Sequence, residues 1–557
     1  MKFGLLVLIL LVLAVCAPVW AQGTATDYAR SEGLAKRFAN KVYRANVTPH
    51  WMPGGRFWYR NDLPGGRREF VLVDPAKAEK RPAFDAAKLA AALSKKLGKT
   101  VDAVRLPVES IAFDEKTGAL RIQSGDRTFG VTQPDYTLTE SDALLGQIEA
   151  RSPGDGPRRS REGGGDTFLT FVNRSGADVT LTWIDSSGNP HEYGTLKADA
   201  RKQQHTIVGH LWLVTRKDGT ELALYTAVPE AAIATIGKTP AAAPARQRSR
   251  PRVENRSPDG KWEISYRSQN VVLRDLAAKT DSPLTTDGTA EDSYQGRAYW
   301  SPDSRHVVIL KTIPEQDHPV SYVESSPKDQ LQPKLHTNQY LKPGDRVAHP
   351  RPHLFDIAAK RDIPIDDALF PNPWDIDEIE WEPDGKRFSF LYNQRGHQTL
   401  RVIAVQADTG AATTIIDETS KTFIDYSGKT YFNRLPKTSE AIWMSERDGW
   451  NHLYLYDTAS GKVKNQITKG DWLVRGVDRV DDEKRQIWFR AGGIVPGQDP
   501  YYIHYCRVGF DGSGLTILTE GDGTHTATFS PDNSYLLDTC SRVDLAPVSV
   551  LRRVADG

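Results

Sequence analysis

The stretch WSPDSRHVVI, residues 300–309, decides the fold of this chain. An aromatic residue ends one strand, a Pro-Asp turn follows, and alternating apolar residues form the next strand. Proline presets φ for the turn, and the aspartate bonds the backbone beyond it. In other copies a glycine or asparagine comes next and accepts a left-handed φ. The stretch is therefore predicted to be a β-hairpin.

Three related phrases occur elsewhere: SPDGKW at residues 257–262, WEPDGK at 381–386 and FSPDN at 529–533. Successive copies are 44, 81 and 148 residues apart. These distances are close to one, two and three and a half units of roughly 40–45 residues, the repeat length of propeller blades. With degenerate copies near residues 53, 110, 443 and 488, the sequence predicts an all-β fold, an eight-bladed β-propeller.

Composition supports strands and does not favour a strongly charged partner. Apolar residues make up 39% of the chain and charged residues 26%, which is ordinary for a globular protein. The 13 Trp and 20 Tyr, against 3 Met, suit strands. A net charge of +1 provides no global field for nucleic acid or an anionic membrane. The histidines show no metal-ligand spacing, so we expect no metal and no cofactor.

The N-terminus resembles a secretory signal peptide over residues 1–21. Lys2 is followed by an apolar core at residues 4–15 and by a small-residue cleavage site that ends at Ala21. The core is too short to span a bilayer. We therefore expect export, to the periplasm or outside the cell. The mature chain would keep Cys506 and Cys540, which could form a disulfide or remain as buried thiols.

The rest of the chain divides by composition. We expect an N-terminal helix and the first blades over residues 27–150, linkers at 151–165 and 236–252, a compact β-sandwich at 166–235, and the remaining blades at 253–550. Helices are predicted over residues 27–46 and 85–97, the second with Asp85 as N-cap and Gly98 after its end. Both linkers carry arginines, and solvated linkers are favoured over an anion-binding patch.

Three segments of the blade region resemble the N-terminal propeller of dipeptidyl peptidase IV, in the prolyl oligopeptidase family of serine peptidases. They are YWSPD at 299–303, the long segment 320–356, and MSERDGWNHLY at 444–454. The resemblance implies a propeller that does no chemistry, caps an α/β-hydrolase domain and filters peptide substrates. It also implies acidic side chains that hold the substrate's amino group. Glu291 and Asp292 are the nearest acidic pair, one or two positions out of register; a solvated loop carboxylate is the alternative.

A hydrolase active site is not found in this sequence. No Gly-x-Ser-x-Gly elbow occurs, and no strand-elbow-helix pattern surrounds Ser513 between its two glycines. We therefore expect the catalytic α/β-hydrolase domain to be absent from this chain, the chain to be inactive alone, and the hydrolase to act in cis or in trans. Arg447 and Asp448 are expected to form an ion pair at a blade turn.

The inserted unit resembles the β domain of the von Hippel–Lindau tumour suppressor. The resemblance rests on FVNRS at 171–175, Trp183, the GNPHEY segment at 188–193 and GHLWL at 209–213. It implies recognition of hydroxyproline in an extended peptide. Five positions carry over, Tyr193 and Trp212 as the aromatic wall and three polar groups: His205, Thr206 and His210. An apolar ring with one hydroxyl suits such a pocket. The alternative is that both tryptophans are sandwich core and the histidines satisfy local backbone groups.

Two functions follow from these resemblances. The first is the propeller portion of an exported dipeptidyl peptidase IV-like serine peptidase, which gates and positions peptides for a hydrolase domain. The second is a secreted scaffold whose inserted β domain captures proline or hydroxyproline peptides. No nucleic acid partner and no membrane span are expected in either case.

Overall fold

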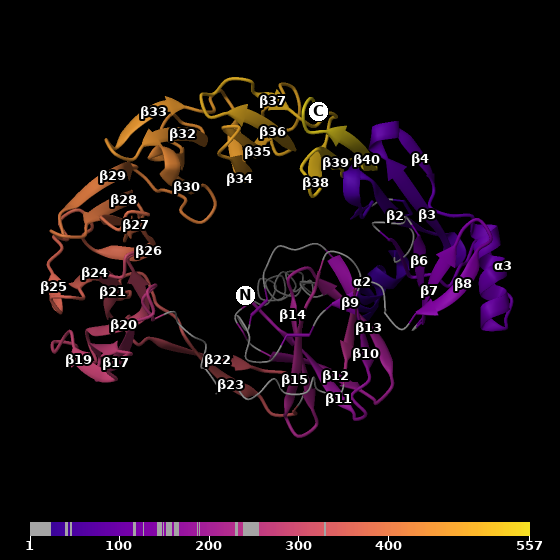
Figure 1. Ribbon diagram of the computed structural model, residues 1–557, viewed down its shortest axis with the longest axis horizontal. Helices are drawn as coiled ribbons and strands as arrows, with labels where there is room; N and C mark the ends of the chain where they lie inside the picture. The colour runs from indigo at the N-terminus through magenta and orange to yellow at the C-terminus, as the bar shows by residue number, and fades with distance from the viewer. Residues whose placement is uncertain are drawn as a thin grey trace, which may run out of the picture.

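The computed structural model shows a chain built mainly of β-strands (Figure 1). It describes residues 24–38, 43–44, 47–114, 119–125, 127–141, 147–148, 150–151, 159–160, 166–186, 188, 190–228, 232–237, 255–327 and 330–557. Two α-helices lie in this part, α2 (Ala25–Phe38) and α3 (Ala86–Leu97). Short 3₁₀ turns occupy Pro53–Gly55, Pro64–Gly66, Pro75–Lys77 and Pro436–Thr438. The prediction of a fold made mostly of β-strands is confirmed.

α3 begins as the sequence predicts, whereas α2 begins at Ala25, two residues before the predicted start at residue 27. The Asp85 carboxylate accepts hydrogen bonds from the backbone N–H groups of Ala87 and Lys88, both at 3.0 Å, and so caps α3. Gly98 ends this helix at φ +66°, a left-handed conformation that favours glycine. α2 ends at Phe38, and the predicted continuation through residues 39–42 and 45–46 lies outside the described residues.

The described residues form eight antiparallel sheets of three or four strands that follow one another along the chain. This count leaves out the inserted unit at residues 147–236 and a two-stranded hairpin at residues 319–339. The strands of the eight sheets are β1 (His50–Trp51), β2 (Phe57–Leu63), β3 (Arg67–Asp74) and β4 (Glu79–Pro82); β5 (Ser110–Phe113), β6 (Leu120–Ser124), β7 (Arg127–Thr132) and β8 (Thr137–Ser141); β17 (Trp262–Arg267), β18 (Asn270–Asp275) and β19 (Thr280–Pro283); β20 (Ser293–Trp300), β21 (His306–Ile313), β24 (His349–Asp356) and β25 (Arg361–Ile363); β26 (Pro373–Trp381), β27 (Arg387–Gln394), β28 (Thr399–Gln406) and β29 (Ala412–Thr419); β30 (Phe432–Leu435), β31 (Glu440–Ser445), β32 (His452–Asp457) and β33 (Lys462–Gln466); β34 (Leu473–Asp481), β35 (Gln486–Gly492), β36 (Ile503–Gly509) and β37 (Thr516–Ile517); and β38 (Thr524–Phe529), β39 (Tyr535–Arg542) and β40 (Leu545–Arg553).

The sheets are arranged along an arc, and the last sheet, β38–β40, lies beside the first, β1–β4 (Figure 1). The arc is open between β5–β8 and β17–β19, where the strands of the described residues between 147 and 236 lie. Repeated four-stranded antiparallel sheets are thus confirmed. Closure into one ring of eight blades stays a prediction.

The deciding stretch folds as a hairpin through bonds of its own side chains. The Ser301 hydroxyl donates to the Asp303 carboxylate at 2.6 Å and accepts from the backbone N–H of His306 at 2.9 Å. Ser304 takes the left-handed conformation at φ +63°. The same serine-to-aspartate bond recurs in the copies that begin at Ser257 and Ser530. The turn is therefore encoded locally in each copy.

These turns also join neighbouring sheets. The backbone N–H of Asp259 donates to the Ser304 hydroxyl of the next sheet at 3.0 Å. Gly385 lies close to the Asp303 carboxylate of the preceding sheet. A Cβ atom at position 385 would be only 3.3 Å from the carboxyl carbon of Asp303, which is a tight contact. At the other junction, Leu537 of the last sheet packs in one apolar cluster with Phe57 of the first.

The inserted unit is a sandwich of two four-stranded sheets, ordered β13-β10-β16-β9 and β12-β11-β14-β15. Its strands are β9 (Gln147–Ile148), β10 (Asp166–Asn173), β11 (Val179–Ile184), β12 (Pro190–Leu196), β13 (Arg201–Ile207), β14 (Leu211–Arg216), β15 (Glu221–Thr226) and β16 (Ala232–Ile236). β9 pairs in parallel with β16, so the sandwich includes residues 147–148, outside the expected bounds of 166–235. Arg201 of β13 forms an ion pair with Glu109 at 2.6 Å, which ties the sandwich to the chain before β5.

A two-stranded hairpin, β22 (Pro319–Glu324) and β23 (Lys334–Gln339), leaves the sheet of β20 and β21 and extends toward the sandwich (Figure 1). Elsewhere, Cys506 and Cys540 are both free, so the disulfide alternative is not realised. Within the described residues, no helix has the length and apolar run needed to span a bilayer.

Candidate peptide-binding site

The candidate site lies on the side of the sandwich where each sheet ends in an edge strand. In the described residues β12 is the edge of one sheet and β13 the edge of the other. Tyr193 projects from β12, His205 and Thr206 from β13, and Trp212 from β14, with His210 just before β14. The structure thus brings the five residues predicted from the sequence to one region of the insert.

Trp212 and Thr206 form the floor of this region. Both are buried, and the Trp212 indole N–H donates to the Thr206 hydroxyl at 2.9 Å. The bond joins β14 of one sheet to β13 of the other. Trp212 also packs against Phe171 at a ring distance of 5.5 Å, so it is part of the sandwich core. The core alternative therefore describes Trp212 correctly without excluding contact with a ligand.

Tyr193 completes the aromatic wall. Its ring meets Trp212 at a centroid distance of 5.0 Å and an interplanar angle of 71°, while 42% of the residue stays exposed. The Lys202 ammonium donates to the backbone carbonyl of Tyr193 at 2.6 Å and so ties β13 to β12. The predicted pair of rings is therefore assembled, with one ring buried and the other accessible.

Trp183 also lies in this region, although it was not among the five site residues predicted from the resemblance. Its indole is stacked between two imidazoles, His210 at 4.8 Å and His191 at 5.0 Å. Burial, with a smaller contribution from the neighbouring His205, lowers the pKa of His210. His210 is therefore neutral at pH 7 and offers one donor and one acceptor. The match of sequence at Trp183 was the signal that could have placed it here.

His205 lies at the exposed rim, with its ring edge-on to Phe168 at 5.3 Å. Two aromatic faces, a neutral imidazole and the edge strands β12 and β13 therefore share one side of the sandwich. This combination suits an extended peptide that carries an apolar ring and a polar substituent. In the described residues no three His, Cys, Asp or Glu side chains gather as a metal site would require.

The predicted acidic pair has a different environment. The Asp292 carboxylate lies 3.4 Å from the Lys311 ammonium and also accepts a hydrogen bond from Arg351. Lys311 forms a second, shorter ion pair with Asp287 at 2.6 Å. Glu291 is exposed, in the turn just before Asp292. Asp292 is therefore neutralised by cations of its own chain, and the two predicted residues do not form an open carboxylate pair.

Lys311 is enclosed in this cluster. Only 8% of its side chain is exposed, and its ammonium lies 5.0 Å from the centre of the Tyr294 ring. The hydrogen bond from Lys311 lowers the pKa of Asp287, against the smaller effect of burial. Two carboxylates and one aromatic face thus surround a single ammonium, which is the chemistry of an amine-binding site already filled by Lys311.

The expected ion pair between Arg447 and Asp448 is not formed. Arg447 instead pairs with the buried Glu418 at 2.5 Å and lies 4.5 Å from the centre of the Tyr454 ring. Asp448 accepts a hydrogen bond from the backbone N–H of Trp450 at 3.1 Å. Adjacent residues in a turn point apart, and each finds a partner on another strand or further along the turn.

Comparison with known protein families finds two matches along the chain. The family model of the dipeptidyl peptidase IV (DPP IV) N-terminal region matches residues 214–547, more than half of the chain. The chain belongs to this family. The model of the VHL beta domain matches residues 159–231, which contain all five predicted site residues of the insert. Both resemblances stated from the sequence are confirmed.

Individual relatives are distant. A probable dipeptidyl-aminopeptidase B of Arthroderma gypseum is 24% identical over 310 residues, 49% of this chain and 33% of its own length. Dipeptidyl-aminopeptidase B of Aspergillus niger is 25% identical over 331 residues, 50% of this chain and 35% of its own. Dipeptidyl peptidase 4 of Trichophyton rubrum is 25% identical over 194 residues, 33% of this chain and 24% of its own. The chain spans only about a quarter to a third of these relatives.

Among solved structures, dipeptidyl peptidase 4 of Porphyromonas gingivalis aligns with 94% of this chain and 60% of its own, at 15% identity and a TM-score of 0.40. A putative dipeptidyl aminopeptidase IV of Bacteroides ovatus aligns with 92% of this chain and 60% of its own, at 13% identity and a TM-score of 0.37.

Proposed function

We propose that this chain is the propeller portion of an exported DPP IV-like serine peptidase, which gates and positions peptides for an α/β-hydrolase domain in the same or another polypeptide. The family match over residues 214–547, along a series of antiparallel sheets, is the observation that supports this proposal. In this role the chain supplies binding and orientation, and the hydrolase supplies the nucleophile. Export would follow from the signal peptide at residues 1–21.

The test is the reading frame that contains and follows this sequence. We expect a hydrolase with a Gly-x-Ser-x-Gly elbow in the same frame or the adjacent gene. The purified chain alone should not cleave dipeptide chromogenic reporters, and the chain together with that hydrolase should. Cleavage by the chain alone, or an unrelated neighbourhood and no active partner, would contradict the proposal. Export is tested separately, by sequencing the N-terminus of protein recovered outside the cytoplasm, which should begin at Gln22.

A second function is supported by the assembled site on the insert. We propose that the inserted domain captures proline-containing or hydroxyproline-containing peptides. The exposed Tyr193 ring over the buried Trp212, with neutral His210 nearby, would receive the pyrrolidine ring and its substituent. The two functions are compatible, because a peptidase for such peptides could recruit its substrate through this domain.

Calorimetry with matched proline and hydroxyproline peptides tests this second function. We expect binding by the unmodified chain, and at least tenfold weaker binding after His210→Ala or Tyr193→Ala. Tyr322→Ala is a matched control, since Tyr322 is an exposed tyrosine of β22, outside the insert. Absence of binding by the unmodified chain would remove this function, and so would equal affinity of all three variants.

A further inference from the structure

Ser160 lies in the segment that composition predicts to be a solvated linker, yet only 5% of this residue is exposed. Its hydroxyl donates to the backbone carbonyl of Ile184 and accepts two hydrogen bonds. The donors are the Trp183 indole N–H at 3.0 Å and the backbone N–H of Leu211 at 2.9 Å. The Ser160 backbone N–H donates to the carbonyl of Asp185 at 3.0 Å. One serine thus makes four hydrogen bonds to the sandwich.

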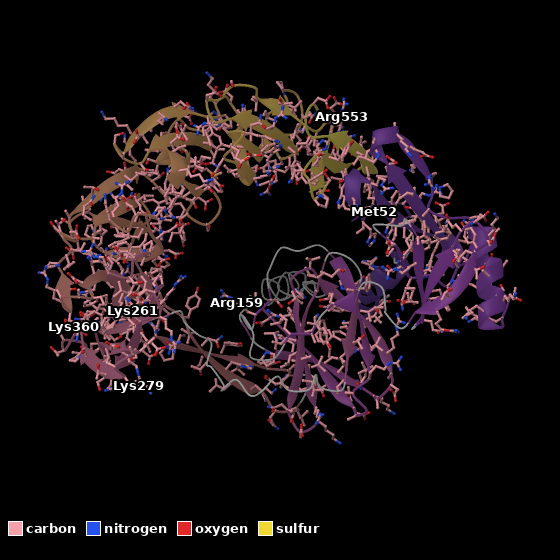
Figure 2. The ribbon with its side chains drawn as sticks, viewed as in Figure 1. Met52, Arg159, Lys261, Lys279, Lys360 and Arg553 are labelled. Atoms are coloured by element: carbon pink, nitrogen blue, oxygen red, sulfur yellow. The ribbon has the colours of Figure 1, made fainter. Side chains whose placement is uncertain are left out.

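These bonds converge on the candidate site. Trp183 is the ring that stacks on His210 at 4.8 Å, and Leu211 is the next residue in the chain after His210. The hydroxyl therefore holds both sides of this stack, the indole through its N–H and the imidazole through the adjacent peptide group. Arg159, the neighbour of Ser160, lies on the border of the sandwich that faces the interior of the arc in this view (Figure 2).

The physical chemistry makes this contact specific. An indole N–H that is enclosed without an acceptor costs about 1–3 kcal/mol, so Trp183 adopts the orientation that reaches Ser160. A stacked ring held at one end by a hydrogen bond has few alternative rotamers. The Trp183–His210 pair is therefore preorganised by a residue that belongs to no strand of either sheet.

We propose that Ser160 is a positioning residue for the peptide site of the insert. Its hydroxyl fixes the stacked rings of Trp183 and His210, so that peptide capture depends on the segment before the sandwich as well as on the strands of the sandwich. This proposal rests on the peptide capture proposed above. It places the functional start of the inserted domain at or before residue 160, in agreement with the match that begins at residue 159.

Two measurements test this role. In the free protein, hydrogen exchange of the Trp183 indole N–H, with its NMR signal identified by its loss in Trp183→Phe, should be at least tenfold faster in Ser160→Ala. In the peptide titration, Ser160→Ala should bind about tenfold more weakly and should discriminate less between hydroxyproline and proline peptides. Ser175→Ala is the control, because the Ser175 hydroxyl bonds Asn173 and Ala177 of the same domain and does not contact Trp183.

A double-mutant cycle separates positioning from general destabilisation. In a Trp183→Phe background, which keeps Ser160 but removes the indole donor, Ser160→Ala should weaken peptide binding by less than threefold. Unchanged indole exchange and affinity in Ser160→Ala would overturn the proposal, as would an equal loss in both backgrounds. If the unmodified chain binds no peptide, the proposed capture fails, while the exchange measurement still decides whether Ser160 holds Trp183.

Discussion

Lys311 should determine whether the acidic cluster of the β20–β21 sheet is stable, and its replacement by methionine tests this directly. The change keeps most of the apolar stem and removes the ammonium 2.6 Å from Asp287 and 3.4 Å from Asp292. Breaking a fully buried pair costs about 3–5 kcal/mol and losing an exposed pair about 0–1 kcal/mol. Asp287 is 59% exposed, and Asp292 keeps its bond to Arg351. We therefore expect a loss of about 1–2 kcal/mol.

Thermal unfolding checks this value, because each loss of about 1 kcal/mol lowers the midpoint of a domain of roughly 150–250 residues by about 2–4 °C, and that of a larger domain by less. Lys386→Met is the matched control, since Lys386 is mostly exposed and its ion pair with Asp384 is 4.0 Å long; we expect no measurable change in the midpoint.

A second experiment uses Lys311→Ala with added propylammonium. A ligand at ten times its Kd adds about 1.4 kcal/mol, so the amine should raise the midpoint of this variant and not that of the unmodified chain. The reasoning would be refuted if Lys311→Met were as stable as the unmodified chain. It would also be refuted if propylammonium did not raise the unfolding midpoint of Lys311→Ala.

Two further outcomes follow from buried groups. Ion pairs with Lys464 and Arg485 outweigh burial and lower the pKa of Glu440 from 4.5 to about 2. Its stabilisation, at most about 3 kcal/mol, is present above pH 4.5 and is lost as the pH falls toward 2, so Glu440→Gln should flatten the acid limb of a stability–pH curve. Burial raises the pKa of the Cys506 thiol to about 12, whereas Cys540 is only partly buried. A thiol reagent should therefore label Cys540 in the native protein and Cys506 only after unfolding; equal labelling rates would contradict this.

The hairpins could be predicted because their determinants are local. In the stretch that begins at Trp300, the serine, the aspartate and the backbone they bond lie within five residues of one another. The copy with Glu382 keeps the turn although the serine is replaced, and there Arg387 pairs with Glu382. Sequence alone could not place β9, because a strand of two residues has no periodicity and its partner β16 is more than 80 residues away.

Some residues of the candidate site could likewise be predicted from the sequence, and others could not. Tyr193, Thr206 and Trp212 were predicted residue by residue from a resemblance, and the structure brings them together. The role of Ser160 could not be predicted from the sequence, because one buried serine does not change the polar, arginine-rich composition of the segment around it. The neutralisation of Asp292 could not be predicted for a different reason, since its cations Lys311 and Arg351 come from strands β21 and β24, which meet only through sheet pairing.

The two candidate peptide contacts lead to one physical conclusion about how this chain would select a ligand. An ammonium binds tightly where carboxylates have no cation of their own, and here Lys311 and Arg351 already neutralise Asp292. The insert offers the opposite kind of surface, aromatic faces with an imidazole whose pKa is lowered and which is therefore uncharged. Recognition of a terminal charge by Asp292 would have to displace ion pairs that the protein already makes, whereas recognition of a ring needs only contact with an exposed tyrosine. Of the two sites predicted from the sequence, the insert therefore keeps an exposed aromatic ring, while Asp292 is already paired with two cations.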